Sequence, residues 1–580
     1  MKFDFINRFL KTCKTVPDGT VKLSIWIILG LPLIAVLAFR LPYFGLTAIN
    51  SDEGLYSAVA RVMQQGGLPY RDAWDHAAPG IFYIYRVIFG IFGAWSLNAV
   101  RMAALLAHFA SGLIVGFEMR RRHGDIIGTF ASVLVIIALG GYLPADTIAA
   151  LTETFLIPFL LIAVIFILRR SEGGKGNPLL TGIFIALATW FKIHALIISI
   201  ILLLAAGYAR FEKEGNWLEN LQFFLKTLTW SGVWYLILVF PLWLSGGFYD
   251  YMTMYIGYNI FYMRAGSYDS VFFEGLWHTM WQWGFPHFLT VSLSLAGMVA
   301  LLQSDGKNRA RGIVLTAGMV AGFFAGITGA RLFGHYFLPA AAFFAWTAAE
   351  GAAYLLHKIK TIENKILSPA GLVAIVIIAT GFLHPILIFH GAAYRARSQM
   401  AVQGGHLRQR FSDLTSKIRE VTRTDEKIWV WGFAPEIYML ARRDCSSRFI
   451  NANYLVGLIP WINAAPHIDT TPFIIDGSWQ LLAEDLKNNP PAAIVDAAVA
   501  NYQFWGKYQM HGNKDLDNFV QSKYQNLGTF NKFRLYLRRD IAEREGYYID
   551  ESNPVANDSL GVKSETGVEE IPGTTTSPNE

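Results

Sequence analysis

The stretch Asn50-Ser51-Asp52-Glu53-Gly54 lies just outside the first long apolar segment of the chain, residues 21–40. A second polar stretch, Leu-Pro-Tyr-Arg-Asp-Ala-Trp-Asp-His-Ala-Ala-Pro-Gly at 68–80, stands before the next apolar segment. Charged side chains are costly beside lipid unless they occupy a solvated pocket or have a chemical task. These two stretches therefore predict a polar site at the edge of a membrane.

The composition outside this loop is typical of a protein with many membrane helices. Of 580 residues, 53% are hydrophobic and 16% are charged, whereas soluble domains carry roughly 25% charged residues. Apolar runs of about 17 to 25 residues recur, which is the length a helix needs to cross a bilayer. We predict an all-α polytopic membrane domain over residues 21–390, with about eleven spans. The predicted spans are 21–40, 97–118, 126–143, 148–168, 179–191, 193–209, 226–246, 276–303, 312–328, 336–356 and 369–389.

The basic residues predict the topology. The formal net charge is +6, and the basic residues cluster in short loops between spans. This clustering indicates that these loops are cytoplasmic and argues against nucleic-acid binding. Residues 1–20 would then lie on the cytoplasmic side, and the protein would reside in a bacterial inner membrane. Residues 80–93 are too short to span comfortably, so we expect a helix at the outer surface. The expected outer loops are 41–96, 144–147, 190–194, 247–275 and 329–335.

The segment 391–545 changes character and predicts a small extracytoplasmic α/β domain. Two apolar runs, Lys427–Trp431 and Ala492–Asp496, are typical of buried strands. Residues 527–530 and 533–537 could form a closing hairpin, and 435–442 and 478–488 are typical of helices. From 546 to 580 the chain is acidic and rich in Ser, Thr, Gly and Pro, which predicts a disordered tail.

Within the first outer loop, apolar residues recur at helical spacing from Glu53 to Gln65 and predict a short interfacial helix. Ser51 or Asp52 would cap it. A carboxylate at a helix N-terminus is held ionised by the unpaired N–H groups, and a positioned carboxylate can serve as a general base. Asp52 could equally be a cap and nothing more. The further acids and the histidine in the same loop, among them Asp75 and His76, favour a functional site.

Three motifs of this loop carry a family resemblance. Asn-Ser-Asp-Glu-Gly-Leu-Tyr (50–56), Gly-Gly-Leu-Pro-Tyr-Arg-Asp (66–72) and Trp-Asp-His-Ala-Ala-Pro-Gly (74–80) resemble the first periplasmic loop of GT-C glycosyltransferases. More narrowly, they resemble the branch related to protein O-mannosyltransferases and to the bacterial aminoarabinose transferases of lipid A. The resemblance covers about residues 20 to 540. Further along the chain it includes Thr152-Glu153, Trp190-Phe-Lys192 and Arg331-Leu-Phe-Gly-His335-Tyr336, and the first loop is its specific part.

This resemblance implies a transferase that takes a sugar from a polyprenyl-phosphate donor. Asp52 matches the first-loop aspartate, which acts as catalytic base or orients the acceptor, and Glu153 matches a second acidic position. Family members often have a lysine just before the Pro-Pro or Pro-Gly turn. This chain has Ala77-Ala78 there, with His76 as the nearest basic group, which leaves the ligand of the donor phosphate open.

Further candidates come from the other outer loops. Lys192 and Arg331 are possible phosphate ligands, because lysine offers a point charge and arginine paired hydrogen bonds. A snorkelling lysine is the alternative for Lys192. The remaining candidates for catalysis or substrate binding are Glu53, Asp75, Arg264, His335 and Tyr336. We expect no cofactor: Asp52, Glu53 and Glu153 could hold a divalent cation, but no Asp-x-Asp spacing occurs near Asp52.

The predicted reaction is an inverting displacement at the anomeric carbon, with Asp52 as base. Lipid A, another glycolipid, a glycan or a protein could be the acceptor. The main alternative is a transporter or lipid flippase, which would show two similar halves and polar groups near the bilayer midplane. A polysaccharide-export scaffold is a second alternative. An enzyme requires Asp52, Glu153, Lys192 and Arg331 to converge on one cavity.

Overall fold

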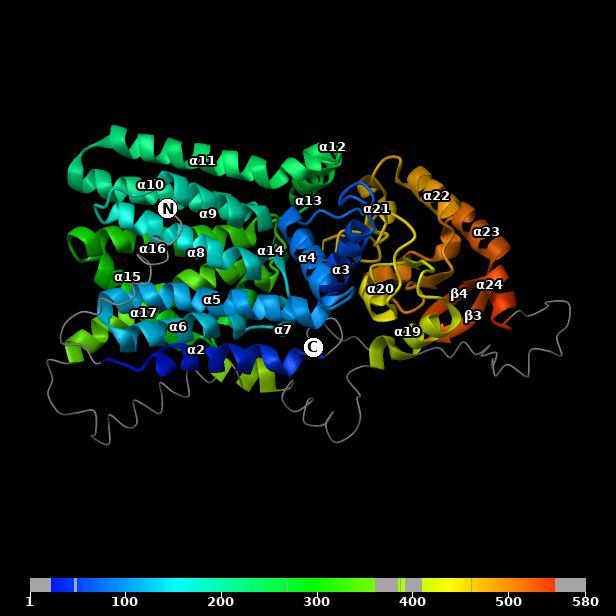
Figure 1. Ribbon diagram of the computed structural model, residues 1–580, viewed down its shortest axis with the longest axis horizontal. Coiled ribbons are helices and arrows are strands. Elements are labelled where there is room, and N and C mark those ends of the chain that lie inside the picture. Colours follow the sequence, from blue (N-terminus) through cyan, green and yellow to red (C-terminus); the bar gives the residue numbers. More distant parts are fainter. Residues whose placement is uncertain are drawn as a thin grey trace.

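Two parts make up the structure: a bundle of long helices and, at one end of it, a small domain with a four-stranded sheet (Figure 1). The computed structural model describes residues 22–45, 49–268, 270–359, 384–385, 387–391, 409–460 and 462–547. In Figure 1 the bundle helices run side by side, the sheet domain (yellow to red) lies beyond their ends, and the first loop lies between the two parts.

The bundle confirms the predicted polytopic helical fold. Its helices are α2 (Ile25–Arg40), α5 (Leu97–His123), α6 (Asp125–Gly140), α8 (Thr152–Ser171), α9 (Pro178–Phe191), α10 (His194–Glu214), α11 (Trp217–Leu244), α14 (Ser270–Gly284), α15 (Phe288–Leu302), α16 (Gly306–Ile327) and α17 (Leu338–Ile359). Among the described residues, six helices are long and apolar enough to cross a membrane, or seven if α14 and α15 form one span. The chain is an integral multi-pass membrane protein.

The predicted span 276–303 is not one continuous helix. α14 and α15 meet at 93°, with residues 285–287 between them. Pro286 lacks a backbone N–H and disfavours helical geometry at the residue before it, which explains the break after Gly284. The predicted span 369–389 lies almost entirely outside the described residues.

Small residues let the bundle helices approach closely. A Cβ at Gly116 of α5 would lie 1.7 Å from Ser132 Oγ of α6, and one at Gly128 would lie 2.4 Å from Arg120 Cβ. Membrane helices associate through such small-residue contacts because lipid provides no hydrophobic driving force between them.

The first loop folds into two short helices, α3 (Ser51–Gln64) and α4 (Pro79–Phe92). α4 has 14 residues, in agreement with the predicted short helix. α3 is buried on most sides, because its outer face packs on α20 (Glu436–Ala441) of the sheet domain. At the contact, a Cβ on Gly54 would lie 2.6 Å from Glu436 N. α3 therefore holds the two parts together.

The sheet has the order β1-β2-β4-β3. β1 (Ile428–Trp431) and β2 (Ala493–Asp496) are parallel and fully buried, as their apolar runs predict. β3 (Tyr524–Phe530) and β4 (Phe533–Arg538) form the expected antiparallel hairpin. The other helices of this domain are α19 (Gln409–Val421), α21 (Asn453–Val456), α22 (Ser478–Asn488), α23 (Lys514–Lys523) and α24 (Arg539–Arg544).

Candidate functional site

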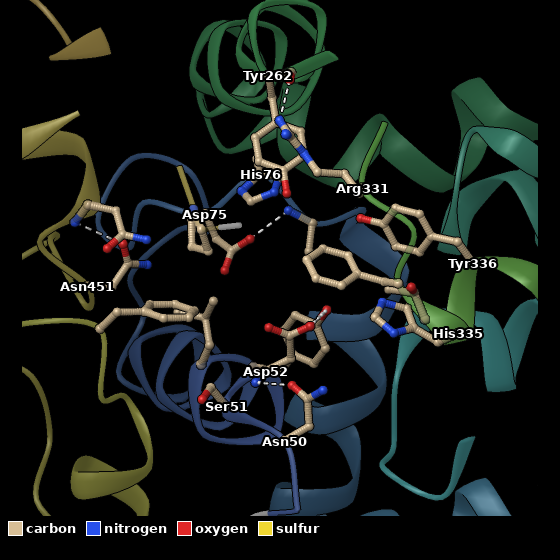
Figure 2. Close-up of a pocket in the computed structure, with 18 of the residues that line it drawn as sticks. Asn50, Ser51, Asp52, Asp75, His76, Tyr262, Arg331, His335, Tyr336 and Asn451 are labelled. Carbon is tan, nitrogen blue, oxygen red and sulfur yellow. Dashed lines mark hydrogen bonds between the residues drawn. The ribbon is translucent and has the colours of Figure 1, made fainter. Parts of the chain in front are cut away.

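A cavity of about 700 Å³ lies where the end of the bundle meets the sheet domain. Its walls come from five parts of the chain: the first loop, the turn at 192–194, α13 (Tyr258–Arg264), the loop 328–336 and the sheet domain. Figure 2 shows Asp52 and Asp75 on opposite sides of this space, with Arg331, His335 and Tyr336 on the bundle side and Asn451 on the sheet-domain side.

Asp52 occupies the first turn of α3 and lines the cavity. The expected cap is wrong by one or two residues: Asn50 caps the helix, and its side-chain oxygen accepts the backbone N–H of Asp52 at 2.9 Å. Asp52 is thus left without a capping task. Tyr56 Oη donates to Asp52 Oδ2 at 3.4 Å. Burial raises the pKa of Asp52, while the nearby positive charges of His335 and Lys192 act against this rise.

Glu53 is not brought to the cavity. Its side chain is 0% exposed, and Arg101 of α5 donates to both of its oxygens, at 3.1 Å from Nε and 2.6 Å from Nη2. The backbone N–H groups of Ile49 and Ala150 complete the set at 3.0 and 3.2 Å. These contacts join the start of α3 to α5 and to Ala150, which precedes α8, so the position of Glu53 fits a positioning role better than the predicted catalytic one.

Lys192 and Glu153 form a partly buried ion pair at the cavity wall. Lys192 lines the cavity, whereas Glu153 lies behind it and is 1% exposed. The Lys192 ammonium lies 3.4 Å from the centroid of the Tyr336 ring, a cation–π contact. Thr152 donates to the second oxygen of Glu153 at 2.7 Å. Glu153 therefore does not line the cavity itself but holds the side chain of Lys192, which does.

Of the three nitrogen atoms of the Arg331 guanidinium, one donates a hydrogen bond within the described structure. Its guanidinium lies 3.8 Å from the centroid of the Tyr262 ring, and Nη2 donates to the Tyr262 carbonyl oxygen at 2.5 Å. Nε and Nη1 are buried and find no hydrogen-bond partner among the described residues. Ala330 and Leu332 on either side both have left-handed backbone, with φ of 56° and 52°. Such strain is costly and concentrates at functional sites.

His335 pairs with Asp146 of α7 (Pro144–Thr147). Its Nδ1 lies 2.8 Å from Asp146 Oδ1, and both residues line the cavity. Burial alone would lower the pKa of His335, but the carboxylates of Glu153 and Asp146 outweigh it, and this pKa is raised. These two carboxylates therefore favour the protonated form of His335, on the side of the cavity that holds Lys192.

Asp75 and His76 line the opposite rim of the cavity. Asp75 is 1% exposed; its Oδ1 accepts the N–H of Ala77 at 2.6 Å, and its buried Oδ2 has no partner within the described part of the chain. Burial raises the pKa of Asp75 to about 7. Burial and the charges of Arg331 and Lys192 lower the pKa of His76 to about 4, so this imidazole is neutral near pH 7 and does not provide a cation.

The predicted binding residue Arg264 is not brought to the site. It ends α13 with an exposed side chain and does not line the cavity. Residues that the sequence did not single out come from the sheet domain, in particular Asn451, Asn453, Tyr454 and Glu436. The run Asn-Ala-Asn-Tyr at 451–454 could have drawn notice as a buried polar stretch between apolar ones. Glu436 accepts a hydrogen bond from Ser51 at 2.6 Å.

No group of three His, Cys, Asp or Glu side chains suited to a metal ion occurs in the described ranges. Three features characterise the cavity: a carboxylate at a helix start, cations from two other loops, and a wall of aromatic and amide side chains. Asp52, Arg331, Tyr336 and Asn451 can be followed in Figure 2.

Comparisons with known proteins find similarity at the level of structure. No protein-family model matches the chain, and no curated protein matches it in sequence. The structure of ArnT from Cupriavidus metallidurans bound to undecaprenyl phosphate has a TM-score of 0.57 at 12% identity, covering 88% of this chain and 97% of that one. The same transferase in the apo state gives 0.55 at 12% identity, with the same coverage. The oligosaccharyltransferase AglB from Archaeoglobus fulgidus gives 0.49 at 14% identity, covering 88% and 74%. The chain therefore has the fold of ArnT.

Proposed function

We propose that this protein is a membrane glycosyltransferase that moves a sugar from a polyprenyl-phosphate donor to a hydroxyl group of an acceptor. The convergence of Asp52, Lys192 and Arg331 on one cavity carries the proposal. A transporter would not need these residues, which come from three separate loops, at one end of the bundle. The ArnT structure with bound undecaprenyl phosphate, which shares the fold, supports the choice of donor.

The donor phosphate binds to Arg331, with Lys192 as a second cation. Nε and Nη1 of Arg331 lack partners in the described chain, so their N–H groups are available to donate charge-assisted hydrogen bonds to phosphate oxygens. The charge of Lys192 is shared with Glu153, so Lys192 orients the phosphate more than it neutralises it. The leaving polyprenyl phosphate is an anion, and these cations stabilise the negative charge that develops on it.

Asp52 acts as the base. The acceptor oxygen forms a bond to the anomeric carbon, its proton passes to Asp52, and the bond from that carbon to the phosphate oxygen breaks with its electron pair on the phosphate. One displacement inverts the anomeric centre. The raised pKa of Asp52 suits this task, because a base works best with a pKa near the working pH. The site would face the outer side of a bacterial inner membrane, with the sheet domain extracytoplasmic.

A release assay tests the proposal. Purified protein is given undecaprenyl-phosphate glucose, mannose or 4-amino-4-deoxyarabinose with candidate acceptors, and freed undecaprenyl phosphate is measured. Asp52→Asn should lower turnover by at least about a hundredfold. Asp72→Asn is the matched control, because Asp72 lies in the same loop, pairs with Arg71 at the surface and does not line the cavity. Undiminished turnover of Asp52→Asn would refute the assignment.

A further inference from the structure

The two walls of the cavity differ in the hydrogen bonds that they offer. The bundle side presents the cations Lys192 and Arg331. Among the described residues that line the cavity, the sheet domain contributes no lysine or arginine; it presents amides, tyrosines and Glu436. An anionic group is therefore stabilised on the bundle side and not on the sheet-domain side.

Two buried side-chain oxygens on the sheet-domain side and the adjoining rim have no hydrogen-bond donor in the described structure: Asp75 Oδ2 and Asn453 Oδ1. Asp75 is 1% exposed and Asn453 is 8% exposed, so bulk water does not compensate them. Buried polar atoms are normally paired, and each exception requires a reason. When Asp75 is ionised both atoms are acceptors, so the missing partner then donates hydrogen bonds.

The two residues lie near each other through Tyr454. Tyr454 follows Asn453 in the chain, and burial together with the nearby Asp75 carboxylate raises its pKa. Its ring packs on Trp74 at 5.8 Å and on Tyr258 at 5.1 Å between centroids. Asn451 is joined to Asn453 by a hydrogen bond from the Asn453 N–H to the Asn451 side-chain oxygen, at 3.3 Å. Aromatic faces thus lie beside unpaired acceptors.

We infer that Asp75 and Asn453, with Asn451 beside them, form a carbohydrate-binding subsite that recognises hydroxyl or amino groups and excludes phosphate. This inference rests on the proposed function for its ligand, a sugar. The sugar is either the one that the donor carries or one at the end of a glycan acceptor. With a pKa of about 7, Asp75 can accept a hydrogen bond when ionised and donate one when protonated, which suits a hydroxyl group.

Binding measurements test this subsite without any turnover, and so separate its failure from failure of the proposed function. Dissociation constants are measured by calorimetry for undecaprenyl phosphate, for its glucose and 4-amino-4-deoxyarabinose conjugates, and for a panel of methyl glycosides. Asp75→Asn and Asn453→Ser each remove an acceptor without adding bulk. Asn518→Ser, at an exposed position of α23, is the matched control, and thermal unfolding confirms that each variant is folded.

A weakening of about tenfold is expected where one hydrogen bond to a buried group is lost. If the subsite holds the donor sugar, both variants weaken the conjugates and leave undecaprenyl phosphate unchanged. If it holds an acceptor glycan, both variants weaken a methyl glycoside and leave all three lipids unchanged. The inference is overturned if the variants weaken undecaprenyl phosphate as much as its conjugates. It is also overturned if neither the conjugates nor the glycosides change.

Discussion

Replacing Glu53 by glutamine separates a positioning role from a catalytic one. In the structure Glu53 is 0% exposed and Arg101 is 2% exposed, and two hydrogen bonds join them. Glutamine keeps the shape of the side chain and removes its charge, so the guanidinium of Arg101 loses this counter-charge in a buried site. Removing one partner of a buried ion pair costs about 3–5 kcal/mol. Glu53→Gln should therefore lower the free energy of unfolding by about that amount.

The assay is thermal unfolding of purified protein in detergent, run beside the release assay. The double variant Glu53→Gln with Arg101→Gln should be more stable than Glu53→Gln alone, because no buried charge is then left uncompensated. Asp72→Asn, which breaks the exposed pair with Arg71, should change the stability by no more than about 1 kcal/mol. If Glu53→Gln unfolds at the wild-type temperature yet loses turnover as fully as Asp52→Asn, Glu53 takes part in the chemistry and the positioning role is refuted.

Three further predictions concern the cavity and its walls. Arg331→Gln should weaken the binding of undecaprenyl phosphate by about tenfold to a hundredfold in calorimetry, because charge-assisted hydrogen bonds are about twice as strong as neutral ones. Arg331→Lys keeps the charge and should restore part of the affinity. Equal affinity of the wild type and both variants would contradict the phosphate assignment. Gly54→Ala should destabilise the protein by about 1–3 kcal/mol in thermal unfolding, since its Cβ would lie 2.6 Å from Glu436 N. Gly90→Ala is the control and should be neutral, because a Cβ there meets nothing within 4 Å. The pKa of Asp75 is raised from 3.8 to about 7. Between about pH 4 and pH 7 the folded state therefore binds more protons than the unfolded state, and the wild-type protein loses stability as the pH rises through this range. The stability of Asp75→Asn relative to wild type should therefore increase from about pH 4 to about pH 7 and stay constant above it, and a pH-independent difference would count against the shift.

Much of the bundle could be predicted from the sequence because the bilayer imposes a length and an apolar composition on each helix. The predicted ranges 179–191 and 193–209 lie close to α9 (Pro178–Phe191) and α10 (His194–Glu214). The bend between α14 and α15 was missed because a long apolar run hides a break; Pro286 was the available signal. The hairpin of β3 and β4 was predictable from two short runs that alternate along neighbouring strands.

The candidate site was only partly predictable, for a different reason. Asp52, Lys192 and Arg331 stand out because charge near lipid is rare. Whether a charged residue faces a ligand or a buried partner depends on contacts across the chain, and the partner of Glu53 lies 48 positions away. Neighbouring residues Asp52 and Glu53 look equivalent in sequence, but successive positions on a helix point about 100° apart. One faces the cavity and the other faces α5.

The position proposed for the donor phosphate follows from a departure from the GT-C loop pattern that the first loop resembles. The first loop has Ala77-Ala78 where that pattern often has a lysine, and His76 is neutral near pH 7 because its pKa is about 4. The first loop therefore presents acids and no cation to the cavity among the described lining residues. Lys192 is already paired with Glu153. Arg331 remains, with two N–H groups directed at no partner in the described chain and strained backbone on both sides. The phosphate should thus lie beside Tyr262 and Arg331, across the cavity from Asp52, which leaves the space between them for the anomeric carbon and the attacking hydroxyl group.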